Sequence, residues 1–337
     1  MEDNKSINSY QNSINNSELK FDLLKIDSTI KKNSIYEEED NKFEFFSEYN
    51  PENESEQDQK IDYPKYISKI KFNSFEYIGI LSKNLKKEVH GYNFFDNGDE
   101  YFGQWNKDKK EGYGIYFYKE DEDPKSSAIK QIYIGEFKNN VKSGEGIYFK
   151  IKNFEEEKRD DILVPNDFNL AIGQFEDDKF IKGLIYSMNE GKKKIYKGKM
   201  NKEGKKSDDN AEIYEDDNKI FCGIVQENVM VEGRIVIMKD GEKEAGYYFN
   251  KKENNGTEGD IEFDYSKGEK NDEKYIKKLN HINDIFDNEV LKDLYVKVMK
   301  IRDNVTGPDN FEYIKNVNYD VDVKQELKDQ YGKFLYC

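Results

Sequence analysis

Two groups of residues in this chain have the types and spacing to do chemistry, and both combine aromatic rings with glycines. The first group is Tyr101, Gly103, Trp105, Gly112 and Gly114, and the second is Tyr133, Gly135, Phe137, Gly144 and Gly146. Rings and bare backbone offer stacking and close contact, which is chemistry of recognition. A fixed internal period indicates an array of one small unit. The function must therefore be argued from an array and not from a pocket.

Weaker copies extend the period in both directions. They begin at Tyr77, Ala171, Tyr196, Phe221 and Glu244, which makes about seven units between residues 77 and 265. Polar insertions at 119–130 and 151–169 lengthen two of the intervals. We expect these insertions to be extended loops on one edge of the array.

Each unit predicts a β-hairpin. Tyr101, Gly103 and Trp105 share one face of a strand, because alternate residues point the same way. The polar run 106–111 that follows is of the kind that closes a hairpin. Glycine inside a strand is unfavourable unless another group approaches the backbone closely. We expect that group to be the ring of the neighbouring hairpin, so that rings stacked on glycines replace a conventional two-layer core.

The pattern resembles the MORN repeat family over roughly residues 77–265. The sequence departs from the family pattern where Ala171 and Glu244 replace the lead tyrosine, and where Ser207 and Asp209 replace the glycine pair. The resemblance implies a mainly β fold, an elongated single-layer antiparallel sheet with one aromatic-lined face. It implies no catalytic activity by itself. The expected divisions are a leader (1–62), the repeat array (63–268) and a helical segment (269–337).

One face of the array is the candidate protein-binding face, because strand parity places a continuous ladder of rings on it. Its expected members are Tyr101, Trp105, Tyr116, Tyr133, Phe137 and Tyr148.

Composition fits a thin, ring-rich sheet better than a compact globule. Hydrophobic residues make up 35% of the chain and aromatic residues 14%, and the net charge is -16. The leader holds 16 acidic and 7 basic side chains, so it is expected to be largely disordered when alone. The sequence shows neither an apolar stretch near the roughly 20 residues that span a bilayer nor a signal peptide. We therefore expect a soluble, intracellular protein.

Two apolar islands interrupt the leader. The first is Leu19, Phe21, Leu23, Leu24 and Ile26, and the second is Phe43, Phe45, Phe46 and Tyr49. Islands of this kind anchor disordered segments to partners, which order the segment on binding. They could equally pack on the chain's own sheet as a first strand. The sequence leaves both alternatives open.

After the array, one apolar stripe predicts a helix over about 273–302. The stripe consists of Ile276, Leu279, Ile282, Phe286, Val290, Leu294, Val298 and Ile301. Asp287 and Asn288 are good cap residues and could break this helix in two. The helix either folds back on the chain's own sheet or docks on another protein. Another short helix is expected over 323–331.

The sequence shows no catalytic or metal-binding pattern. It contains no phosphate-binding loop and no nucleophile elbow, and its Gly-x-Gly pairs open strands where such loops open helices. Cys222 is expected to fill a small apolar space in a strand. His90 and His281 lack ligands at metal spacing and are expected on the surface or in linkers. We expect no enzyme, no cofactor, no metal site and, without a basic stripe, no nucleic-acid partner.

Two classes of function remain. The first is a structural scaffold that binds protein partners and associates with itself, since the chain resembles MORN proteins of ciliary radial spokes and other cytoskeletal assemblies. That resemblance implies the cytoplasm, the cytoskeleton and the axoneme of a cilium as the location. The second is a membrane-associated organiser that binds phospholipid or links membrane to cytoskeleton. Binding anionic lipid needs a basic surface, and the acidic balance of this chain disfavours it.

Overall fold

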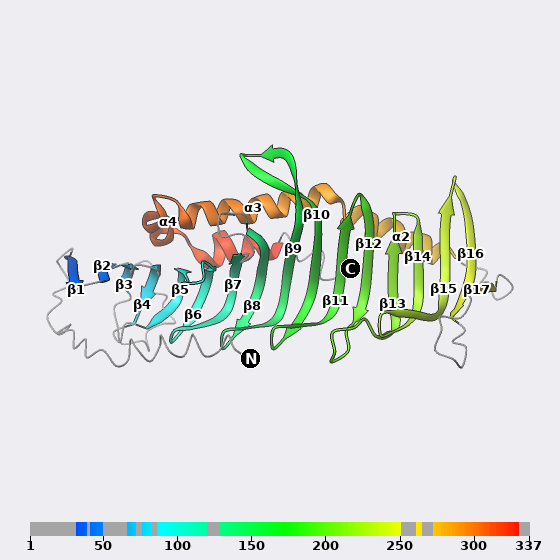
Figure 1. Cartoon of the computed structure of the whole chain (residues 1–337), viewed down its shortest axis with the longest axis horizontal. Coiled ribbons are helices and arrows are strands. Elements are labelled where there is room, and N and C mark those ends of the chain that lie inside the picture. The colour runs from blue at the N-terminus through cyan, green and yellow to red at the C-terminus, as the bar shows by residue number, and fades with distance from the viewer. Residues whose placement is uncertain are drawn as a thin grey trace.

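The chain folds into a long open sheet followed by helices (Figure 1). The computed structural model describes residues 32–38, 41–49, 66–71, 76–82, 86–119, 129–250, 261–264 and 272–329. These residues contain 17 strands, and each strand pairs antiparallel with the next in sequence. The expected mainly β fold, an elongated antiparallel single sheet with a helical C-terminal segment, is confirmed.

The strands follow the units of the repeat. They are β1 (Lys32–Glu38), β2 (Asn41–Tyr49), β3 (Tyr66–Lys71), β4 (Glu76–Leu81), β5 (Lys87–Phe94), β6 (Glu100–Asn106), β7 (Lys109–Lys119), β8 (Ile129–Lys138), β9 (Val141–Arg159), β10 (Ile162–Glu176), β11 (Lys179–Asn189), β12 (Lys192–Lys199), β13 (Asp208–Glu215), β14 (Lys219–Gln226), β15 (Val229–Lys239), β16 (Glu242–Asn250) and β17 (Ile261–Asp264).

The leader contributes to the sheet earlier than the expected boundary at residue 62. Its strand β1 pairs with β2, and β2 pairs with β3. Phe43, Phe45 and Phe46 therefore lie in a strand of the chain's own sheet, which is one of the two alternatives for this island. The other anchors, Leu19, Phe21, Leu23 and Leu24, lie outside the described residues.

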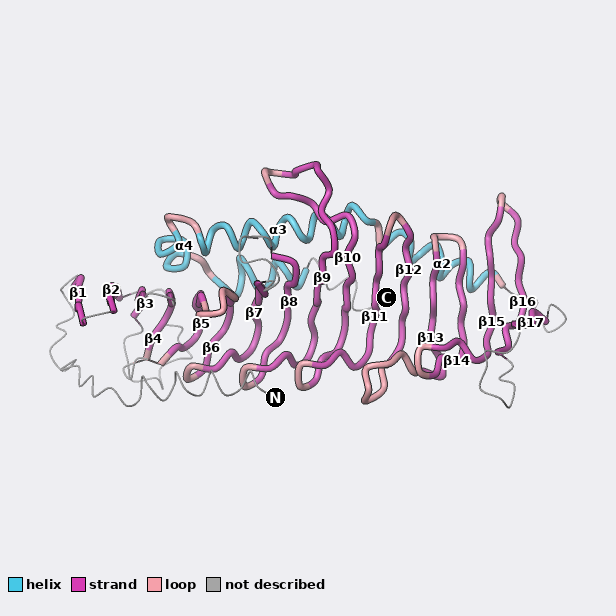
Figure 2. The backbone as a smooth tube through the Cα atoms, in the orientation of Figure 1, coloured by secondary structure: helices cyan, strands magenta, loops and turns pink. Residues whose placement is uncertain are grey.

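The C-terminal helices run back along one face of the sheet, opposite to the order of the strands. They are α2 (Glu273–Ile285), α3 (Asn288–Thr306), α4 (Asn310–Asn316) and the π-helix η5 (Tyr319–Gln325). Helix α2 contacts β14, α3 contacts β10 and α4 contacts β4 (Figure 2). Of the two alternatives for the helical stripe, folding back on the sheet is the one observed. None of the helices in the described residues is long and apolar enough to cross a membrane.

The stripe is broken between α2 and α3 at one of the expected cap residues. The carboxylate of Asp287 accepts a hydrogen bond from the Glu289 N–H at 2.9 Å, which satisfies one free donor at the start of α3. The expected short helix at 323–331 is preceded by two others, since α4 and η5 follow α3 directly.

A conventional two-layer core lies between the helices and the sheet, so the expectation that ring–glycine stacking replaces such a core is wrong for this face. Stripe residues Leu279, Ile282, Phe286, Leu294 and Val298 are buried, and Ile276, Val290 and Ile301 are partly buried. They pack in one cluster with sheet residues that include Ile78, Phe102, Ile115, Phe117, Ile134, Ile147, Phe149, Leu170 and Tyr186. A second buried row on the helices, Tyr275, Leu291, Tyr295 and Met299, lies outside the predicted stripe.

The insertion at 151–169 is not a loop. It extends β9 and β10 into a two-stranded arm that rises past α3 (Figures 1 and 2). Arg159 in this arm donates to Asp293 at 2.9 Å and also pairs with Glu289. Phe154 adds a ring contact to Tyr295, with centroids 6.3 Å apart. The arm therefore holds α3 through an ion pair and a ring contact.

Two carboxylate–arginine pairs fix the helices along the sheet. Arg302 of α3 donates to Glu100 of β6 at 3.0 and 2.7 Å. Arg234 of β15 donates to Asp272, just before α2, at 2.8 and 3.0 Å, and both side chains of this pair are buried. Leaving one partner of a buried pair alone is costly. The two pairs therefore allow one register of the helices on the strands.

We expect Phe286→Ala to lower the unfolding free energy of the full chain by about 3 to 5 kcal/mol, because it opens a cavity in the helix–sheet core. Phe286 is fully buried, and its ring stacks on Tyr186 with centroids 6.1 Å apart. The measurement is urea denaturation followed by circular dichroism. Lys297→Ala, at a side chain 42% exposed on α3, is the control and should change little. Equal stability of the two variants would show that the helices are not part of the folded core.

Candidate functional site

The face of the sheet opposite the helices carries the predicted rings. Tyr101, Trp105, Tyr116, Tyr133 and Phe137 lie in one buried cluster, and Tyr148 packs against it half-buried. All six predicted residues are thus brought together. We call the core of this cluster, Tyr77, Tyr101, Trp105, Tyr133, Phe137 and Phe175, the ring ladder.

The second aromatic residue of a unit links that unit to the one before it. The Trp105 ring meets Tyr101 of its own unit at 5.0 Å and Tyr77 of the preceding unit at 6.0 Å between centroids. Phe137 likewise lies 5.1 Å from Tyr133 and 5.2 Å from Tyr101. All four contacts are edge-to-face, the geometry that aromatic quadrupoles favour by about 0.5–1.5 kcal/mol a pair. The ladder therefore couples neighbouring hairpins.

The ring that lies over each glycine pair belongs to the same hairpin, not to its neighbour as the spacing led us to expect. Gly103 and Gly114 face each other across β6 and β7. A Cβ atom on Gly103 would lie 2.4 Å from the Tyr101 hydroxyl, and one on Gly114 would lie 2.5 Å from it. The Tyr101 ring lies along its own strand toward the residues that follow it, and its hydroxyl donates to the Gln104 carbonyl at 2.8 Å.

The first position of each Gly-x-Gly pair requires glycine for a different reason. Gly112 and Gly144 have φ angles of 71° and 64°, in the left-handed region that favours glycine. A Cβ atom on Gly112 would also meet the side chain of Gln104 at 2.4 Å. That side chain accepts a hydrogen bond from the Tyr113 N–H at 2.8 Å. One glycine of the pair thus permits a bulge, and the other permits the ring.

An interlock between hairpin turns was missed at the level of sequence. The Asn140 N–H donates to the Lys110 carbonyl at 3.0 Å, and the Lys110 N–H donates to Asn140 Oδ1 at 2.8 Å. The same reciprocal pair joins Asp108 to Lys87, Asp178 to Lys142, and Asn228 to Lys206. The sequence signal for this pair is an Asp or Asn two residues before a lysine, as in Asp108-x-Lys110 and Asn140-x-Lys142.

The lysines of this interlock turn their amines onto the rings. Lys110 lies 4.2 Å from the ring centre of Tyr116, and Lys87 lies 4.7 Å from that of Trp105. Lys142 and Lys206 lie over Tyr148 and Tyr196 at 5.2 and 5.0 Å. These are cation–π distances. The face is therefore an aromatic surface with a row of ammonium groups laid over it.

Burial changes the titration of these amines. It lowers the pKa of Lys87 to about 7, against the opposing effect of the Asp108 carboxylate, and lowers the pKa of Lys110 to about 8. Burial also raises the pKa of Tyr77 and of Tyr101 well above the usual value for tyrosine. Removing charge from water disfavours the charged form in every one of these groups.

The rings of the predicted face are mostly hidden from solvent. Tyr101 and Tyr133 are fully buried, and Trp105, Phe137 and Tyr116 are 5%, 4% and 9% exposed. A partner on this face would meet the lysines and the half-buried Tyr118 and Tyr148 first. Partner binding by the six predicted residues stays a prediction.

The ladder is not continuous along the whole sheet. Beyond β11 a separate buried cluster takes over, formed by Tyr196, Ala211, Ile213, Phe221, Val225, Ile235 and Tyr248. Its rings make fewer mutual contacts, with Phe221 and Tyr248 meeting at 5.7 Å between centroids. The unit that begins at Ala171 separates the two clusters.

Two segments, residues 101–120 and 133–150, match the family model of the MORN repeat. The chain therefore contains MORN repeats. The matched segments begin at Tyr101 and Tyr133, the two units in which the ring–glycine pattern is intact. MORN repeats are generally found in scaffold proteins and in proteins that bind membrane and cytoskeleton. A search of curated proteins finds no match to the chain.

The cysteine and histidine singled out in the sequence lie on the helix-covered side of this MORN sheet. Cys222 stands between Glu212 and Arg234 in the strand register, and burial raises the pKa of its thiol to about 12. His90 is not a surface residue as expected. It is 5% exposed and its ring stacks on Tyr319 of η5 with centroids 5.6 Å apart. Both side chains serve the contact between helices and sheet.

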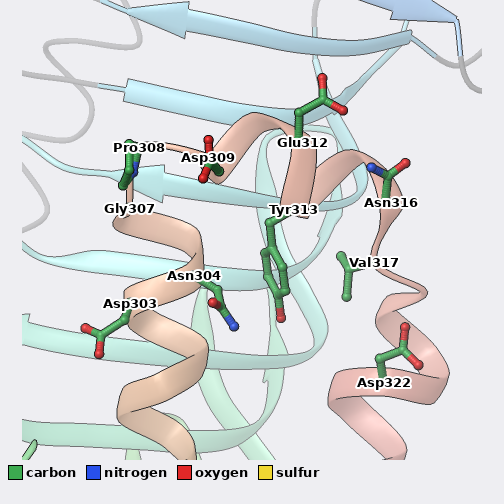
Figure 3. A pocket seen from close by; sticks show the side chains of 10 residues that line it. All are labelled: Asp303, Asn304, Gly307, Pro308, Asp309, Glu312, Tyr313, Asn316, Val317 and Asp322. Carbon is green, nitrogen blue, oxygen red and sulfur yellow. The ribbon is translucent and has the colours of Figure 1, made fainter. Parts of the chain in front are cut away.

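An acidic hollow lies where α3, α4 and η5 meet (Figure 3). It has a volume of about 620 Å³ and is lined by Asp303, Asn304, Gly307, Pro308, Asp309, Glu312, Tyr313, Asn316, Val317 and Asp322. Its carboxylates give it a negative potential. Within the described residues no group of three His, Cys, Asp or Glu side chains is arranged to hold a metal ion.

We expect Gly135→Val to destabilise the full chain by about 3 kcal/mol, the scale of an overpacked core. A Cβ atom at this position would lie 2.6 Å from the Glu145 carbonyl and 2.7 Å from the Tyr133 hydroxyl. Gly191→Asn is the matched control, because nothing lies within 4 Å of that position and asparagine tolerates its φ of 75°. An unchanged melting temperature for Gly135→Val would sink the ring–glycine account.

The buried lysines predict stability that increases with pH. Unfolded lysine titrates near 10.4, so between about pH 7 and 10 the unfolded chain binds more protons than the folded chain, and the unfolding free energy rises. Above about pH 10 the raised pKa values of Tyr77 and Tyr101 reverse the trend. Urea titrations across this range should show a smaller slope for Lys87→Met than for the exposed neighbour variant Lys109→Met. Identical slopes would contradict the burial of the Lys87 amine.

Proposed function

We propose that the protein is a non-catalytic scaffold that binds protein partners in a cytoskeletal assembly, and that this assembly is a ciliary axoneme of the radial-spoke kind. No cofactor and no nucleic acid enters this proposal. The proposed location is the cytoplasm and its cytoskeleton.

The observation that carries the proposal is the coupling between units. Neighbouring hairpins are joined by a strand ladder, and in the units from Tyr77 to Phe175 they are also joined by reciprocal turn pairs such as Lys110–Asn140 and by inserted rings such as Phe137. The helices add a second layer that spans the sheet from β14 to β4. Coupling of this kind favours a stiff extended body, because bending it would break backbone and ring contacts in several units together. A stiff, extended body suits a spacer or platform between partners.

The ciliary part of the proposal is supported by the resemblance of the repeat to MORN proteins of radial spokes. The scaffold part has broader support, because MORN repeats are generally found in scaffold proteins and in proteins that bind membrane and cytoskeleton.

Localisation of a tagged full chain tests the proposal in cells. We expect the chain in the detergent-insoluble cytoskeletal fraction, with crosslinks to a fixed set of proteins. Serine at Leu19, Phe21, Leu23 and Leu24 should weaken incorporation if this island anchors a partner. Serine at Asn12, Asn15, Asn16 and Asn33, the four nearest asparagines, is the control. Recovery of the chain in the soluble fraction under native expression would remove the scaffold proposal.

Membrane association is the competing outcome. The chain's net charge of -16 opposes binding to anionic lipid. We expect only marginal flotation of the full chain with vesicles that contain phosphatidylserine or phosphoinositides at physiological salt. Tight flotation that weakens as salt is raised would favour the membrane organiser over the cytoskeletal scaffold.

A further inference from the structure

Three units of the sheet build the same seat for a tyrosine ring. Its floor is a facing glycine pair, and the hydroxyls of Tyr77, Tyr101 and Tyr133 lie within 2.4–2.7 Å of the Cβ positions of both glycines. Its far end is the carbonyl of the residue three positions after the tyrosine. The three hydroxyls donate to Ile80, Gln104 and Glu136 at 3.0, 2.8 and 3.0 Å. The seat is therefore a repeated piece of structure with a fixed occupant.

The fourth unit keeps the facing glycine pair of this seat without its tyrosine. Gly173 of β10 faces Gly183 of β11, and the register shifts one residue later than in the filled units, after Gln174, which still pairs with Lys182. Both glycines have positive φ angles, 149° and 137°, which the glycines of the filled seats do not have. Ala171 stands where those units have tyrosine. The three atoms nearest to a Cβ on Gly173 are all backbone atoms, at 2.2–3.1 Å, and the same is true of Gly183. Among the described residues, no side-chain atom comes closer than 3.1 Å to either Cβ position.

The surroundings of this seat are apolar. Phe175 closes one side, and its ring already meets Tyr133 at 5.1 Å and Phe180 at 5.5 Å between centroids. Phe180 occupies the position at which other units place a lysine over the rings, so this unit carries no ammonium there. Ala171, Phe180 and Ile185 are only partly buried, in contrast to the fully buried rings of the filled seats.

We propose that the seat over Gly173 and Gly183 binds a tyrosine side chain of a partner protein, with its hydroxyl donating to the carbonyl of Gln174. The filled seats of the same sheet identify the occupant, because each holds a phenol ring over a facing glycine pair with its hydroxyl on the carbonyl three residues along the strand. The ring of the partner would complete the stack between Phe175 and the second cluster, which begins at Tyr196. The inference deepens the scaffold function and rests on it.

The test uses p-cresol, the tyrosine side-chain analogue, with the full chain in saturation-transfer NMR. We expect p-cresol to bind the natural protein and toluene to bind about tenfold more weakly, because toluene lacks the hydroxyl. Ala171→Tyr should fill the seat from within and abolish p-cresol binding without lowering the melting temperature. Ala171→Ser, which keeps a small side chain, is the matched control and should retain binding.

A second variant vacates one of the filled seats. Tyr133→Ala should give the protein an additional p-cresol site, because it removes the tyrosine ring from over Gly135 and Gly146. The inference is overturned if the natural protein binds no p-cresol, if binding survives in Ala171→Tyr, or if that variant melts markedly earlier, which would mean that the space is already taken. These outcomes are separate from the cellular test, because a chain that binds p-cresol yet is absent from the cytoskeletal fraction contradicts the scaffold function instead.

Discussion

The structure depends on the absence of a side chain at paired positions of neighbouring strands. Gly135 and Gly146 face each other in the sheet, and the Tyr133 ring lies across both. A Cβ atom on either glycine would lie 2.5–2.7 Å from the ring or from the opposite backbone, which is too close for atoms that are not bonded. The phenol therefore lies flat on its own hairpin, which leaves its edges free to meet Phe137 and Phe175.

This arrangement divides the work between the two faces of the sheet. On one face the rings fold onto their own strands, so that face reaches high burial with a single layer of side chains and a cover of lysine amines. On the other face, apolar residues such as Ile115 and Ile134 alternate with the rings and have no such internal cover. They are covered by α2 and α3, which the Arg302–Glu100 pair holds in register. A sheet this thin stays folded because each face has its own cover.

The sequence is sufficient to predict the hairpins and the common face of Tyr101, Trp105 and Tyr133, because the spacing of two fixes strand parity. It does not predict which ring covers which glycine, since a ring can reach its own strand or the next. The path of the helices is equally hidden: the stripe from Ile276 to Ile301 marks a buried face but not its partner. The arm at 151–169 was misjudged because its charged residues resemble a loop, although they serve as ion-pair partners of α3.

The regularity of the array also limits where a partner can gain binding energy. Where the pattern is intact, as around Tyr101, the rings are buried and a new contact would add little apolar area. Binding energy is available where the pattern fails, because there the facing glycine pair remains and the tyrosine of the unit is replaced. The unit of Ala171 is such a place, between two clusters that each end in partly buried apolar side chains. In such a repeat array, the imperfect unit determines which partner binds. The regular units determine how far that binding site lies from the two ends of the sheet.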